Sequence, residues 1–184
     1  MICSCDFFMK ALIALLVTVG TVAGQWPPPK SPAVPEADGY VEIPNAALVP
    51  EKTNSYRAIF DATRAADKPS ELLPAINMAG SELNALAVMK IPLSDARFAV
   101  VFHGSAVDGV LDDAHYKAKF GISNPNLKSI AVMKKHGVKF FVCGQYLAAA
   151  QIDPKAITPD VTLAADALLV LMQYQKKGYA LMSF

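Results

Sequence analysis

Cys143 is the residue of this chain with the clearest capacity for chemistry. It ends an apolar run, residues 139–142, and is followed by Gly144 and Gln145. A thiol where a buried strand meets a turn is either an inert packing residue or a nucleophile. If Gln145 opens a helix, the free N–H groups of the first turn would stabilise the thiolate, which is the reactive form. Burial among aromatic neighbours would favour the neutral thiol, so the spacing leaves both interpretations open.

His103 is the second candidate, because it ends another apolar segment and is followed by Gly104. It could carry a proton for Cys143, orient a substrate or hydrogen-bond a loop carbonyl. A metal site built from His103, Asp108 and His115 has no recognised ligand spacing, and a Cys-His-Asp hydrolase matches no sequence pattern. We therefore expect no metal and no cofactor.

The elements that position these residues alternate along the chain. Hydrophobic patterning predicts strands over 56–63, 97–104, 139–142, 161–163 and 179–184. It predicts helices over 70–89 with Ser70 as N-cap, and over 112–120, 124–137, 145–150 and 164–177. Such alternation is typical of a parallel or mostly parallel sheet sandwiched by helices. Functional groups gather beyond the carboxyl ends of such strands, which is where Cys143 and His103 fall.

The first 52 residues predict an exported protein with a proline-rich arm. Lys10 precedes an apolar stretch that closes on small residues, which is typical of a signal peptide over 1–24. An uncleaved anchor is the alternative. We expect a proline-rich arm or linker over 25–52 and one α/β domain over 53–184. The mature protein would be periplasmic or secreted, with no membrane association after cleavage.

Charge and cysteine content narrow the function classes. The formal net charge is +1, and no basic cluster carries interleaved aromatic residues, so nucleic acid is not an expected partner. Cys3 and Cys5 lie within the predicted signal, which leaves Cys143 alone in the mature chain. A single cysteine excludes an intrachain disulfide framework and indicates intermolecular pairing, reactivity or simple burial.

Several motifs, taken in order, resemble one protein family. The chain is similar to the DsrE/DsrF-like family in four segments, residues 100–106 around Phe102-His103-Gly104, 116–126 ending in Asn124-Pro125-Asn126, 137–145 around Val142-Cys143-Gly144-Gln145, and 175–181. The resemblance covers roughly residues 56–184. It implies a three-layer α/β sandwich of flavodoxin-like architecture, with a mixed or parallel sheet of about five strands.

The resemblance also implies a function and an assembly. Characterised cytoplasmic members act in sulfur oxidation or in sulfur relay for tRNA thiolation, where a cysteine accepts sulfane sulfur as a persulfide. Cys143 matches that position and is the catalytic residue we predict. His103, Gly104, Asn124, Gly144 and Gln145 are the residues that could support it.

The expected partners follow from this resemblance and from export. They are other copies of the chain, as a trimer or hexamer, and a sulfur donor or acceptor protein, whereas export excludes the tRNA pathway. Two alternatives remain: a non-enzymatic oligomeric binding or assembly module with a buried structural Cys143, and a redox sensor that forms an intermolecular disulfide.

Overall fold

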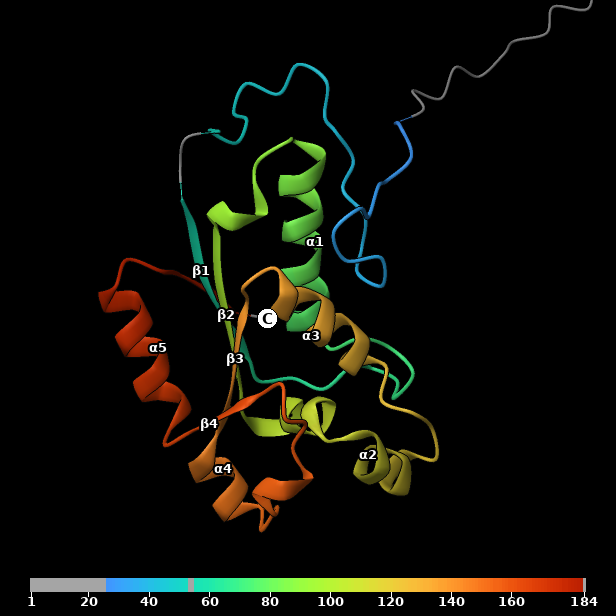
Figure 1. The fold of residues 1–184 in the computed structure, drawn as a ribbon, viewed down its shortest axis with the longest axis vertical. Coiled ribbons are helices and arrows are strands. Elements are labelled where there is room, and N and C mark those ends of the chain that lie inside the picture. The colour runs from blue at the N-terminus through green and yellow to red at the C-terminus, as the bar shows by residue number, and fades with distance from the viewer. Residues whose placement is uncertain (1–25, 53–54, 184) are drawn as a thin grey trace, which may run out of the picture.

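The computed structural model of the chain describes residues 26–52 and 55–183, and its centre is a five-stranded sheet (Figure 1). The strands are β1 (Tyr56–Ala62), β2 (Ala96–Phe102), β3 (Lys139–Cys143), β4 (Thr162–Ala164) and β5 (Ala180–Ser183). Their order is β4-β3-β2-β1-β5, and every neighbouring pair is parallel. The predicted α/β fold with a mostly parallel sheet of this size is therefore confirmed.

Helices cover both faces of the sheet. They are α1 (Pro74–Val88), α2 (Asp113–Phe120), α3 (Asn126–Lys135), α4 (Gly144–Ala149) and α5 (Ala167–Lys176), with 3-10 turns at Leu93–Asp95, Gly104–Val110 and Pro154–Ala156. Figure 1 shows α1 and α3 on one side of the sheet and α5 on the other. The molecule thus has three layers.

Two separate cores follow from this layering, because successive strand residues point to opposite faces. One core joins strand side chains such as Phe60, Phe102 and Phe140 to α1 and α3. The other is smaller and joins Ile59, Val101 and Cys143 to α5. The predicted cysteine therefore lies on the face that α5 covers.

Two helix starts differ from the sequence-based expectation by three or more residues. The first long helix begins at Pro74 rather than Ser70, and its N-cap is Leu73, which makes no side-chain capping bond. Proline suits the first helical position and keeps the preceding residue out of helical geometry. The last helix begins at Ala167 rather than at 164, because residues 162–164 pair with β3 as strand β4.

Part of the proline-rich segment packs on α1. Val34 is fully buried, and Asn84 on α1 binds the segment through four hydrogen bonds of its side-chain amide. Lys30 and Tyr40 close the loop through an antiparallel bridge. The segment docks through the buried side chain of Val34 and the amide of Asn84. The proline content predicted an extended arm and gave no signal for this docking. The division of the chain at residues 52 and 53 stays a prediction.

The predicted signal peptide over 1–24 lies outside the described residues, and export stays a prediction. Among the helices of the described part, none combines the length and the apolar character that crossing a membrane requires.

Candidate functional site

Cys143 is the last residue of β3, and the chain turns directly from it into α4. Its residue is 5% exposed, and its Sγ accepts a hydrogen bond of 3.3 Å from the backbone N–H of Ala167. Ala167 is the first residue of α5. The helix expected after Cys143 is present, but the N–H group that binds the sulfur comes from the start of α5 instead.

This N–H group gives the sulfur a polar contact inside a buried, mostly apolar cluster of side chains. A sulfur that carries negative charge accepts such a bond more strongly than a neutral thiol does. The positive end of the α5 dipole also favours an anion at that position. The position therefore suits a thiolate or a persulfide anion better than apolar packing alone would.

His103 lies at the same edge of the sheet and is held by a carboxylate. Its Nε2 is 2.7 Å from Oδ1 of Asp61, and the side chains of the two residues are 23% and 15% exposed. Its backbone N–H donates to the carbonyl of Ala62 at the end of β1. A carboxylate on Nε2 fixes a proton there and leaves Nδ1 as the acceptor of a neutral ring.

Glycines allow both strands to turn sharply beyond this edge. Gly104 has a φ of 58°, and a Cβ there would lie 2.9 Å from the carbonyl oxygen of Thr63. A Cβ on Gly144 would lie 2.8 Å from the carbonyl oxygen of Ala164. Both glycines therefore allow a close approach of neighbouring backbone. Gln145 is exposed on α4.

Asn124 has a structural role away from this edge. Its amide group donates to the carbonyls of Gly109 and Leu111, and its Oδ1 accepts the backbone N–H and the side-chain amide of Asn126. All of these contacts join the loop before α3 to the 3-10 turn at Gly104–Val110. Asn124 is thus not brought to Cys143.

The three residues weighed as metal ligands do not converge. Asp108 pairs with Lys119, and His115 pairs with Asp112 at the start of α2. In residues 26–52 and 55–183, no cluster of three or more His, Cys, Asp or Glu side chains is placed to hold a metal ion.

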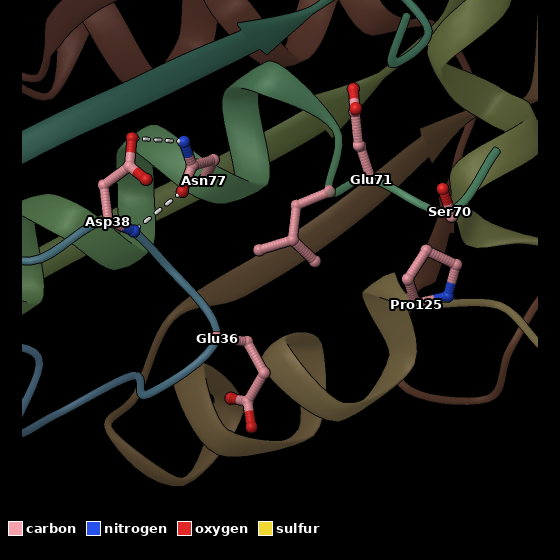
Figure 2. Close-up of a pocket in the computed structure, with 7 residues that line it drawn as sticks. Glu36, Asp38, Ser70, Glu71, Asn77 and Pro125 are labelled. Carbon is pink, nitrogen blue, oxygen red and sulfur yellow. Dashed lines mark hydrogen bonds between the residues drawn. The ribbon is translucent and has the colours of Figure 1, made fainter. Parts of the chain in front are cut away.

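Two cavities lie on the α1 side of the sheet and not at Cys143. Figure 2 shows the first, of about 580 Å³, which collects the carboxylates of Glu36, Asp38 and Glu71. These carboxylates already have partners, which are Lys128, Asn77 and Lys68 in that order. The Lys128 ammonium beside Glu36 holds the pKa of that carboxyl below its usual range.

The second cavity, of about 630 Å³, is mostly apolar. It opens between α1 and strands β1 and β5, where Phe60, Phe98 and Met182 line it beside Glu82. Partial burial raises the pKa of Glu82. Neither cavity reaches the sulfur.

The sequence did not reveal two contributors to the site. Asp61 is the one charged residue between Ile59 and Ala62, and a carboxylate inside an apolar strand was the signal available for it. Ala167 contributes a backbone N–H, for which no residue type is a signal.

The family model described as the DsrE/DsrF-like family matches residues 55–184. The ychN protein from E. coli has a similar structure, with a TM-score of 0.51 and 15% identity, over 70% of this chain and 99% of that one. A protein of unknown function from Methanobacterium thermoautotrophicum, MTH1491, gives 0.49 and 16% over the same shares of the two chains. No curated protein matches the chain.

Proposed function

The chain belongs to the DsrE/DsrF-like family, and on that premise we propose that it acts in sulfur relay, with Cys143 as the residue that accepts sulfane sulfur as a persulfide. The observation that carries this proposal is the hydrogen bond from the Ala167 N–H to Sγ at the carboxyl edge of the sheet. Reactive groups gather at this edge in open α/β sheets.

The chemistry is an exchange between sulfur atoms. The thiolate of Cys143 attacks the outer sulfur of a donor persulfide, and the donor leaves as a thiolate. The new persulfide on Cys143 keeps the Ala167 N–H as a donor to its negative charge. A thiol of an acceptor protein then takes the outer sulfur by the same exchange and restores Cys143.

Intact-mass analysis with peptide mapping tests this proposal. Purified protein is incubated with polysulfide, and a gain of about 32 Da per sulfur is expected, reversed by a reductant. Mapping should place the gain on Cys143, and Cys143→Ser should show none there. If Cys143 gains no sulfur and resists alkylation until the protein unfolds, the carrier role is wrong. The chain would then be a binding or assembly module with a structural cysteine.

Self-association is a second part of the proposal. Leu168, Leu169 and Met172 on the outer side of α5 are 58%, 51% and 57% exposed. Clusters of exposed apolar side chains are typical of interaction surfaces. A homo-oligomer, as a trimer or hexamer, would cover them. Light scattering on wild-type protein and on Met172→Lys measures this, and a wild-type monomer at all concentrations would contradict it.

Export is the third part, and it concerns the compartment in which the exchange takes place. We infer a periplasmic or secreted protein from the apolar stretch after Lys10. Cell fractionation and sequencing of the mature N-terminus test it, with a new terminus just after Ala23 or Gly24 as the expected result. A full-length chain in the cytoplasm would contradict it.

A further inference from the structure

We propose that Asp61 and His103 form a proton-handling pair for Cys143, so that the three side chains act as one unit at the edge of the sheet. This inference rests on the proposed sulfur exchange, because it assigns the proton that the exchange must move. Three observations carry it, and they concern register, contact and burial.

The register between β2 and β3 relates His103 to Cys143. Strand pairing aligns Phe102 with Val142, and His103 has an extended backbone with φ of −152° and ψ of 177°. Continued by one residue, this register brings His103, just past the end of β2, beside Cys143 at the end of β3, at the strand spacing of about 4.8 Å.

The three side chains also share a face. Asp61 is aligned with Val101, which lies two residues before His103. Residues two apart on a strand point to the same side. Val101 and Cys143 both belong to the core under α5. Asp61, His103 and Cys143 thus all point to the α5 side, on three neighbouring strands.

The contact with Asp61 and the burial of the pair determine which ring nitrogen of His103 can accept a proton. The 2.7 Å bond between Asp61 and Nε2 of His103 holds the ring in place and leaves Nδ1 as its proton acceptor. Both side chains are largely shielded from water, so solvent weakens the contact between them less than it would weaken a surface pair. Geometry of this kind is often completed only when the substrate is bound.

The proton and the electrons balance in this scheme. Nδ1 of His103 takes the proton of the Cys143 thiol, and the resulting thiolate forms a bond to the outer sulfur of the donor persulfide. The sulfur–sulfur bond of the donor breaks, and its electron pair leaves on the donor thiolate. The imidazolium then protonates that thiolate, so the step needs neither an oxidant nor a reductant.

Other charged and titratable groups lie around this end of the sheet. They are Asp166 at the start of α5, Tyr174 on the same helix, Tyr146 on α4 and Arg64 just beyond β1. Asp166 already accepts the N–H of Leu169. Because these groups remain in every variant used below, a change in pH dependence can be assigned to the pair.

The test measures two rates on Cys143 from pH 5 to pH 9, alkylation by iodoacetamide and sulfur uptake from polysulfide. We expect His103→Gln to lower both rates by about 10²-fold near neutral pH, with the difference shrinking at high pH, where the thiol ionises without help. Added imidazole should restore part of the rate to His103→Gly. Asp61→Asn should lower the rates while leaving the ring in place, and it serves as the second variant if His103→Gln does not fold.

The chain contains a matched control. His115 also bonds a carboxylate, with Nδ1 2.8 Å from Asp112, but this pair is on the surface of α2. His115→Gln should leave both rates and their pH profile unchanged.

The outcomes separate this inference from the proposed function. If His103→Gln has the wild-type profile while Cys143 takes up sulfur, or if its loss is the same at every pH and imidazole restores nothing, the pair does not handle the proton. If wild-type Cys143 takes up no sulfur but its alkylation still depends on His103, the pair stands and the sulfur assignment is wrong.

Discussion

Asn84→Ala is the change that best tests how the N-terminal segment is held on the domain. Asn84 is fully buried, and its Oδ1 accepts the N–H groups of Ala33 and Val34 at 2.9 and 2.8 Å. Its Nδ2 donates to the carbonyls of Val34 and Asp38. Alanine would leave two buried N–H groups without an acceptor, since neither has another hydrogen bond in the described structure.

The magnitude follows from two limits. Each buried N–H without an acceptor costs about 1–3 kcal/mol, so the pair costs about 2–6 kcal/mol if the segment stays docked. If the segment detaches, water satisfies both groups, but the burial of Val34 is lost, which costs about 1.5–3 kcal/mol. The variant adopts whichever of the two states, docked or detached, has the lower free-energy cost. We therefore expect a decrease of about 2–3 kcal/mol in the free energy of unfolding, with cleavage by trypsin at Lys30.

Asn77→Ala is the matched control for this experiment. Asn77 is on the same helix and also binds the segment, but through Asp38 at the surface. The change in helix propensity is the same in both variants and cancels in the comparison. Urea denaturation should show a loss below about 1 kcal/mol for Asn77→Ala. Equal losses in the two variants, or wild-type resistance to trypsin in Asn84→Ala, would refute the reasoning.

Three further changes test the packing and the charges. Gly80→Ala should destabilise the protein although alanine has a higher helix propensity than glycine, because the new Cβ would lie 2.5 Å from the Cβ of Ala37. A higher melting temperature of the variant would contradict this. Gly104→Ala should destabilise because of the positive φ and the nearby carbonyl of Thr63, while the more open Gly121→Ala should cost less in the same urea titration. Burial raises the pKa of Glu82 in the folded state, so its contribution to stability is present below the unfolded pKa and is lost as pH rises through the folded one. Glu82→Gln should therefore stabilise at pH 7 and not at pH 3, and a constant difference across that range would exclude this cause.

Local patterns predicted most of the fold. The apolar runs that became β1, β2 and β3 contain their own signal, and the alternation with helices was enough to indicate a parallel sheet. The first residue of a helix was harder to predict, because Ser70 and Pro74 are both residue types that commonly begin helices and only packing decides between them. The docking of residues 30–40 could not be predicted, since it depends on one buried asparagine 50 residues away.

The sequence indicated two candidate residues of the site but not their arrangement. Cys143 and His103 could be found because each ends an apolar run before a glycine. Their side-by-side placement depends on the register between β2 and β3, and the bond to Asp61 on its register with β1. These are long-range alignments that a single sequence does not encode in residue types.

The proposed exchange requires access to a cysteine that is only 5% exposed. The helix α5 forms part of the layer over Cys143, and the N–H of its first residue, Ala167, bonds the sulfur. Within the described contacts, the start of α5 is held by this bond, by the Asp166 cap on Leu169, by the bond from the Val170 N–H to the carbonyl of Asp166 and by the burial of Ala167. Helix ends open far more readily than the core of a domain does. If the start of α5 opened, Leu171 and Tyr174 would still hold the rest of the helix against the sheet. In the proposed exchange, such an opening would admit a donor or an acceptor to Sγ.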